Sequence, residues 1–315
     1  MKTLRKGDRS PDVRTLHQKL SAMGYPLAPS DFFNAKTDNA VRNFQRKHNL
    51  MPDGIVGAKS WLALGTKKSS TAPAKPVTPA KPFNPLIDWL TLLGALGVQF
   101  AASAKNAPPS LELSRPVSLL KTSEKGLQFI YTHEAWAGRS NVLHWPGGGS
   151  GVTLGPGYDM KERTKEAITK DMQTIGLPAE LAKKIAEGAG LKGESAKKFA
   201  AENSVKTKEL VKLDEKVEIV LLKLILPDYE ARVKRRITVD LLQHEFDALV
   251  SFAYNIGSIP LAVANPLNLG KIRDALSEFK SRNTSGGKVN QGLIKRRELE
   301  LTLYNFGDYG KLRVI

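Results

Sequence analysis

Cysteine is absent from the 315-residue chain. Its absence excludes disulfide frameworks, thiolate zinc sites and hydrolases that use a cysteine nucleophile. Histidine is scarce, and none of the five forms the HExxH pattern of zinc peptidases, because Ala137 and Ala248 stand where the second histidine would follow His133 and His244. Zinc-dependent hydrolysis is therefore not expected, and nothing in the sequence indicates a metal or any other cofactor.

Acidic residues are few relative to basic ones: 48 Lys and Arg stand against 31 Asp and Glu, a net charge of +17. Such an excess favours a polyanionic partner, which could be nucleic acid, an anionic envelope surface or a cell-wall polymer. The basic residues are spread along the chain, and no known nucleic-acid-binding pattern is present. We therefore expect loose attraction to an anionic surface and no nucleic-acid partner.

Long apolar runs are also rare. Residues 1–13 are charged throughout and contain no apolar core, so we expect no signal peptide. Residues 86–104 have about the length of a membrane-spanning helix, but Asp88 and Gln99 interrupt them. A linker helix that packs on a neighbouring domain is the favoured interpretation, with a membrane span as the alternative.

The composition changes along the chain suggest two domains and a linker. Hydrophobic residues make up 41% of the chain, which is enough for a buried core. Proline recurs at every third residue from Pro73 to Pro85, which is typical of a semi-extended tether. We predict a first domain at 1–66, a Pro-rich linker at 67–117 that contains the apolar helix 86–104, and a second domain at 118–315.

The first domain contains an internal repeat. Residues 30–37 align with residues 53–60, and in each copy a turn and two apolar residues lead to Ala-Lys and a hydroxyl residue suited to cap the next helix. Apolar residues at helical spacing lie before, between and after the two copies. The pattern predicts three short helices joined by turns, with Phe32, Phe33 and Trp61 in the core.

This domain resembles the peptidoglycan-binding domain of cell-wall hydrolases. The motifs that carry the resemblance are Leu4 to Asp8, Val13 with Leu16, Gly24-Tyr25, Ala40-Val41 with Phe44-Gln45, and Asp53 to Gly57 with Trp61. The resemblance implies that bacterial peptidoglycan is the partner. The first turn, Ser30 to Asn34, lacks the glycines of the family pattern, which leaves the contacts to sugar or peptide open.

From residue 118 onward the pattern is helical, except at 141–160, where glycine, aromatic and β-branched residues predict a loop and a hairpin. The fold class is therefore α+β and mostly helical, with one small β-hairpin. If residues 155–157 form the hairpin loop, Thr153 and Asp159 lie directly opposite each other, with Cβ atoms about 5 Å apart.

Two carboxylates in this region suit glycosidic bond cleavage, which needs one protonated carboxyl group and one ionised carboxylate. Glu134, near the end of an apolar helix at 126–136, suits the acid; Asp159, beside a hydroxyl and glycine backbone, suits the base that activates water.

Each of these residues also has an alternative, structural role. Glu134 could be a surface carboxylate and Thr153 a simple strand former. Asp159 could cap a helix that begins near Lys161. Residues Tyr158 and Asn255 are candidates for sugar contacts or for core packing, and His133 and His144 for structural or rim positions.

The second domain resembles the phage-type lysozymes of glycoside hydrolase family 24, in particular their pesticin-like branch. The motifs are Glu134 in its helix, Gly151 to Gly155 with Gly157-Tyr158, Ser251 to Gly257, and Gly292 to Glu298 with Leu301 and Tyr304. The resemblance implies a lysozyme-like domain that cuts the β-1,4 bond between N-acetylmuramic acid and N-acetylglucosamine, with Glu134, Thr153 and Asp159 as its catalytic residues. Two departures are Ala135, where many relatives have glycine, and Gly147, where the usual phage enzyme has its aspartate.

Together the two resemblances indicate a modular, monomeric phage endolysin that passes from the host cytoplasm to the periplasm and cell wall on lysis. Inversion at the anomeric carbon is expected if the two carboxyl groups lie about 6.5–9.5 Å apart. The alternatives are a lytic transglycosylase, which needs only the acid, a secreted antibacterial effector or bacteriocin, and a binding or membrane-disrupting protein whose lysozyme-like domain is inactive.

Overall fold

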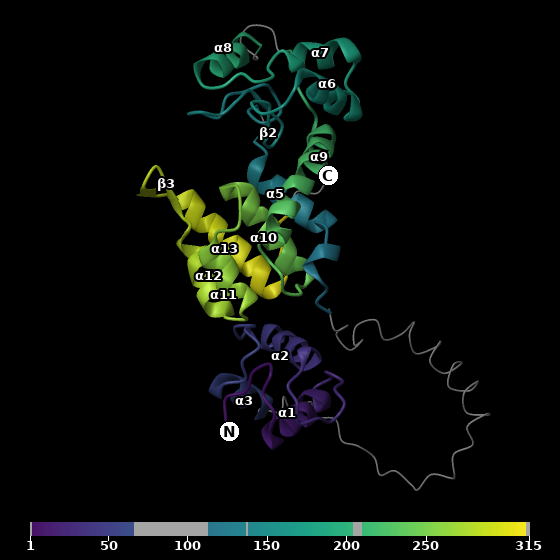
Figure 1. Cartoon of the computed structure of the whole chain (residues 1–315), viewed down its shortest axis with the longest axis vertical. Coiled ribbons are helices and arrows are strands. Elements are labelled where there is room, and N and C mark those ends of the chain that lie inside the picture. Colours follow the sequence, from purple (N-terminus) through teal and green to yellow (C-terminus); the bar gives the residue numbers. More distant parts are fainter. Residues whose placement is uncertain (1, 66–112, 137, 204–209, 313–315) are drawn as a thin grey trace, which may run out of the picture. The chain divides into compact units, whose positions relative to one another are not determined.

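The computed structural model describes residues 2–65, 113–136, 138–203 and 210–312 (Figure 1). The chain divides into two compact units, Met1–Leu113 and Ser114–Ile315. The predicted apolar helix at 86–104 and nearly all of the predicted linker lie outside the described residues, so both stay predictions. Within the described ranges, no helix combines the length and apolar character that crossing a membrane requires.

The first unit contains the three predicted helices, which are α1 (Pro11–Ala22), α2 (Ala35–Lys47) and α3 (Ala58–Gly65). Their apolar faces enclose one core, which includes Phe33 and Trp61. Phe32 departs from the prediction: it is 37% exposed, and the Arg9 guanidinium lies 5.0 Å from its ring centre. The cap of α2 is also one turn earlier than predicted, because Asn34 accepts the hydrogen bond from the Thr37 amide at 3.0 Å.

The second unit is built around α10 (Gln243–Ile256), a helix of which almost every residue is buried. Helices α5 (Glu124–Glu134), α9 (Glu215–Lys234) and α13 (Gln291–Phe306) pack against it. The Ser123 hydroxyl caps α5 and also donates to Asp247 of α10 at 2.5 Å, which fixes the start of α5. Helix α5, which carries Glu134 at its other end, is therefore joined to the core helix at its start.

The remaining helices fall into two groups on either side of α5 and α9 (Figure 1). On one side lie α11 (Leu261–Asn268) and α12 (Ile272–Ser281), with a small hairpin of β3 (Thr284–Ser285) and β4 (Lys288–Val289). On the other lie α6 (Lys165–Thr174), α7 (Ala179–Ala186) and α8 (Glu194–Glu202), with the hairpin of β1 (Thr153–Leu154) and β2 (Tyr158–Asp159). A single 3-10 turn, η1 (Val117–Leu119), precedes α5. The predicted α+β class, mostly helical, is confirmed, but β3 and β4 form a second hairpin where the sequence predicted only one.

Candidate active site

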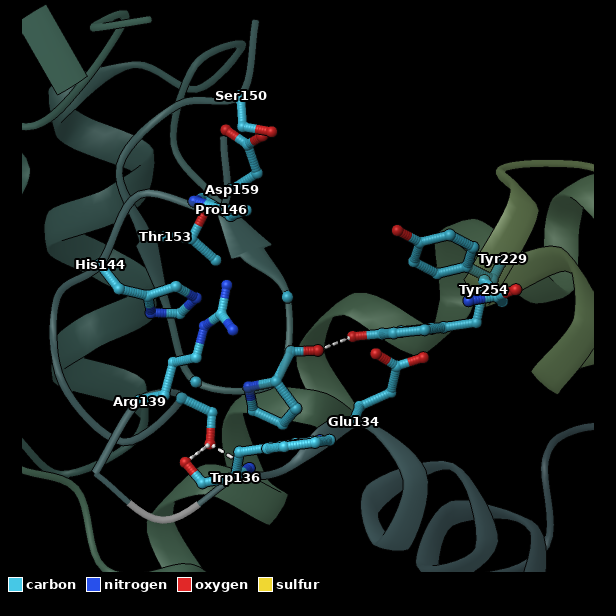
Figure 2. A pocket seen from close by; sticks show the side chains of 15 residues that line it. Glu134, Trp136, Arg139, His144, Pro146, Ser150, Thr153, Asp159, Tyr229 and Tyr254 are labelled. Atoms are coloured by element: carbon cyan, nitrogen blue, oxygen red, sulfur yellow. Dashed lines mark hydrogen bonds between the residues drawn. The ribbon is translucent and has the colours of Figure 1, made fainter. Parts of the chain in front are cut away.

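A pocket of about 500 Å³ lies between the β1–β2 hairpin and the helices α5, α9 and α10. Its volume is within the usual range of ligand-binding pockets. Glu134, Thr153, Asp159 and Asn255 all line it, so four of the five residues selected from the sequence are brought together. Figure 2 shows Thr153 and Asp159 on one side of the pocket and Glu134, with Tyr254, on the other.

The β1–β2 hairpin has the predicted register: Thr153 pairs with Asp159, and Leu154 with Tyr158. The three-residue loop between the strands needs glycine at its last position, because Gly157 has φ +123° and a Cβ there would lie 2.6 Å from the Tyr254 hydroxyl oxygen. That hydroxyl donates a hydrogen bond to the carbonyl oxygen of Pro156 (Figure 2). The loop is thereby fastened to α10 at the floor of the pocket.

Asp159 is held by the backbone around it. Its two carboxylate oxygens accept hydrogen bonds from the amides of Lys161, at 2.9 Å, and Gly151, at 3.2 Å. A side chain at Gly151 would prevent this approach, since a Cβ would lie 2.3 Å from an Asp159 oxygen. The alternative that Asp159 caps a helix is wrong, because the next helix begins at Lys165 and Thr164 caps it.

Thr153 is buried except where it lines the pocket. Its hydroxyl donates to the carbonyl oxygen of Gly151 at 3.3 Å. The hydroxyl oxygen therefore keeps its lone pairs for accepting a further hydrogen bond. Because Thr153 is the partner of Asp159 in the hairpin, its hydroxyl and the carboxylate belong to the same wall.

Glu134 is the last residue of α5, and its side chain is 24% exposed. Arg296 of α13 donates a hydrogen bond to its Oε1, while its Oε2 has no partner among the described residues. The helix C-terminus disfavours a negative charge, and the arginine offsets this. The environment of Glu134 is thus less apolar than predicted.

Arg296 is a functional candidate that the sequence reasoning missed. It is buried and also donates to Glu300, at 3.0 Å, and to the backbone carbonyl of Ser251, at 3.3 Å. Burial on its own lowers the pKa of Arg296, but the charges of Glu134 and Glu300 outweigh it and raise the pKa above the ordinary value for arginine. Its position beside Glu134 depends on a contact across the sequence that no local pattern encodes.

Of the two predicted sugar contacts, Asn255 lines the pocket and Tyr158 does not. Tyr158 is fully buried; its hydroxyl donates to Asp171 at 2.6 Å, and the Arg163 guanidinium lies 4.2 Å from its ring centre. Burial, and then the hydrogen bond to Asp171, raise its pKa. Tyr158 therefore packs in the core, which was one of its two predicted roles, and does not line the pocket.

Two further side chains extend the pocket. Trp136 follows Glu134 closely and is 67% exposed, and its amide donates to the Ser140 hydroxyl at 2.9 Å. The imidazole of His144 contacts the Val142 carbonyl oxygen through Nδ1, at 3.0 Å, and burial lowers its pKa. His144 is therefore a pocket residue, whereas His133 contacts the Phe129 carbonyl within α5, as expected of a structural histidine.

The structure gives no sign of a metal centre in the ranges it describes: no three His, Asp or Glu side chains there are grouped closely enough to bind an ion. The polar groups that line the pocket include carboxylates, hydroxyls and an arginine.

Comparison with known proteins agrees with the modular organisation. Residues 9–64 match the family described as putative peptidoglycan binding domain, and residues 132–249 match a domain of unknown function, DUF8812. The chain is 48% identical to the endolysin of Bacillus phage B103 over 79 residues, which are 24% of this chain and 30% of that protein. It is 36% identical to the endolysin of Lactococcus phage c2 over 93 residues, 29% of this chain and 38% of that protein. The chain thus covers well under half the length of these relatives.

Two solved structures are also similar. The endolysin from Escherichia coli O157:H7 phage FAHEc1 aligns with 61% of this chain and 98% of its own, at 23% identity and a TM-score of 0.40. The muramidase domain of SpmX from Asticaccaulis excentricus aligns with 59% of this chain and 97% of its own, at 21% identity and a TM-score of 0.37. The family match at residues 9–64 and the endolysin relatives confirm the resemblance of this chain to modular endolysins that carry a peptidoglycan-binding domain.

Proposed function

We propose that this protein is a peptidoglycan hydrolase of the muramidase type, which cleaves the β-1,4 bond between N-acetylmuramic acid and N-acetylglucosamine. The observation that carries the proposal is that Glu134 and Asp159 line opposite sides of one pocket. A glycoside hydrolase needs two carboxyl groups on opposite sides of the bond that it cleaves.

Glu134 is the proposed general acid. It gives its proton to the glycosidic oxygen as the bond from that oxygen to the anomeric carbon breaks. The carboxylate that remains is next to the Arg296 guanidinium, which stabilises the negative charge that develops on Glu134. Arg296 is thus a positioning residue that acts through Glu134.

Asp159 and Thr153 are proposed to hold the attacking water. The water oxygen bonds to the anomeric carbon, and its proton passes to the Asp159 carboxylate. The Thr153 hydroxyl oxygen, whose own hydrogen is given to the Gly151 carbonyl, can accept the second hydrogen of that water. Asp159 then releases its proton to solvent, and Glu134 takes up a proton from solvent, which restores the starting state.

The first unit is proposed to hold the enzyme on its polymeric substrate. A tether between a binding unit and a catalytic unit raises the effective concentration of new glycan strands near the pocket. The net charge of +17 adds attraction to an anionic envelope. We further propose that the protein is a phage endolysin, reaching the wall from the host cytoplasm on lysis.

One observation favours a second candidate, a lytic transglycosylase. Both Asp159 oxygens already accept backbone hydrogen bonds, as expected of a residue that only shapes the hairpin. In a transglycosylase the 6-hydroxyl of the muramic acid attacks instead of water, so Asp159 would be dispensable and the products would have anhydro ends.

Digestion of purified peptidoglycan tests the proposal. The wild type should release fragments with new reducing ends on muramic acid, and Glu134→Gln should release none. Glu298→Gln, which changes an exposed glutamate of α13, is the matched control and should retain wild-type activity. Anhydro ends would favour the transglycosylase, and fragments cut only in the stem peptides would contradict both.

A further inference from the structure

The side chain of Asn255 is oriented by one hydrogen bond. Asn255 is next to last in α10, and its Oδ1 accepts from Nη2 of Arg297 at 2.8 Å. A guanidinium group has only donors, so it selects the oxygen of the amide and turns the NH₂ group the other way. The orientation of this asparagine follows from the chemistry of its partner.

The NH₂ group of Asn255 has no protein partner in the part of the chain that the structure describes. Asn255 is half-buried and lines the same pocket as Glu134 and Asp159. Two N–H donors are therefore available to whatever occupies the pocket. Because an amide nitrogen does not accept hydrogen bonds, the part of the bound molecule that contacts this NH₂ group must be an acceptor.

Arg297 is held firmly enough to fix this orientation. It is fully buried, its guanidinium lies 4.7 Å from the ring centre of Phe252 and 5.7 Å from that of Phe279, and Glu300 lies 3.0 Å from its Nη2. Burying a guanidinium is costly unless a negative charge compensates it, and here the Glu300 carboxylate does so. Burial also lowers the pKa of Arg297.

We propose that Asn255 donates a hydrogen bond to an amide carbonyl of the substrate, and that Arg297 is the positioning residue that presents this donor. The inference rests on the proposed function and names a specificity determinant for it. Amide carbonyls occur in a peptidoglycan strand in the N-acetyl group of each sugar and in the stem peptides. We assign the contact to the N-acetyl group of a sugar bound beside Glu134.

The assignment predicts discrimination against de-N-acetylated glycan. Removing the acetyl group replaces an accepting carbonyl with an ammonium group, which only donates. The Asn255 NH₂ group would then face another donor and would be left without a hydrogen-bond acceptor. The wild type should therefore cleave N-acetylated strands faster than de-N-acetylated ones by roughly tenfold or more in kcat/KM.

The test compares kcat/KM on peptide-free glycan strands in N-acetylated and de-N-acetylated form. Asn255→Ala should lose roughly tenfold on acetylated strands, mainly through KM, with little change on de-N-acetylated strands. Asn255→Asp keeps the oxygen for Arg297 and replaces the donor with an acceptor, so it should shift the preference toward the de-N-acetylated strand. Asn265→Ala, an exposed asparagine of α11 outside the pocket, is the matched control.

The outcomes separate this inference from the proposed function. No cleavage of any strand by the wild type would overturn the proposed function and the inference with it. Wild-type cleavage with an equal loss on both strands in Asn255→Ala would overturn the inference alone. If Asn255→Ala lost no activity on the peptide-free strands but did lose activity on intact peptidoglycan, the inference would also be overturned, because the carbonyl would then belong to the stem peptide. Circular dichroism of each variant checks folding, and rescue of the preference pattern by Asn255→Gln would support the donor role.

Discussion

Arg296 of α13 donates a hydrogen bond to Glu134 at the end of α5, although 162 positions separate them in the sequence. The contact joins the last helix of the chain to the first helix of the second unit at the proposed catalytic carboxylate. Arg296 also bonds Glu300 and Ser251, so the position of its guanidinium is fixed by the core.

Arg296→Met should lower both stability and activity. Glu300 would be left buried without one of its cationic partners, and breaking such a pair costs about 2 kcal/mol or more. Loss of the charge beside Glu134 should lower kcat by roughly a hundredfold, with a smaller effect on KM. Urea unfolding and peptidoglycan turnover measure the two effects. An unchanged kcat in a folded variant would remove Arg296 from the mechanism.

Asp159→Asn should lower turnover by roughly a hundredfold or more, because the amide cannot take a proton from water. The variant keeps an acceptor oxygen for only one of the two backbone amides, so circular dichroism must show that the second unit is still folded. Asp240→Asn, at an exposed loop position where no described residue contacts the carboxylate, is the control and should retain full activity. Full activity in Asp159→Asn would support the transglycosylase instead.

Trp136→Ala should raise KM on glycan strands by roughly fivefold to tenfold, as expected for the loss of about 1 kcal/mol of apolar contact with a sugar ring. Trp136→Phe keeps an aromatic face and should recover most of the affinity. Leu269→Ala removes another strongly exposed apolar side chain, one that does not line the pocket, and should have no effect. Equal KM values for Trp136→Ala and the wild type would show that the indole does not contact the glycan.

His144 should make the second unit less stable in mild acid. Burial lowers its pKa below the ordinary value near 6.5, so between these two values the unfolded chain binds more protons than the folded one. Stability should therefore fall as the pH drops below about 6.5 and level off above it. Thermal unfolding from pH 5 to 7.5 should show a weaker pH dependence for His144→Gln than for the wild type. Parallel curves would contradict the prediction.

Tyr158→Phe tests whether this residue is structural. The hydroxyl donates to Asp171, so its loss should cost about 1–2 kcal/mol of stability. Because Tyr158 lies outside the pocket lining, KM should stay at the wild-type value. A raised KM with unchanged stability would indicate that Tyr158 contacts the substrate and is not a structural residue.

The sequence could predict the hairpin but not its surroundings. Glycine on both sides of Pro156 marks the loop, and the twofold period of strands then places Thr153 opposite Asp159. The same rule would have placed Tyr158 on the opposite face from Asp159, which is where the structure has it. Local pattern fixes these relations because they span only a few residues.

Contacts between distant segments could not be predicted in this way. The bond from Arg296 to Glu134 depends on how α13 and α5 both pack on α10, which no local spacing encodes. The exposure of Trp136 depends on a turn held by the Ser140 hydroxyl, which also donates to buried Glu218 at 2.8 Å. An aromatic residue beside an apolar helix would ordinarily be expected in the core.

Digestion of peptidoglycan in heavy-oxygen water reports whether water enters the cleaved glycosidic bond. If Glu134 and Asp159 together hydrolyse the glycosidic bond, each new muramic acid end should carry one heavy oxygen, beyond the slow exchange measured with a reducing saccharide alone. Anhydro ends without heavy oxygen, or label confined to the stem peptides, would show that the enzyme does not hydrolyse the glycosidic bond.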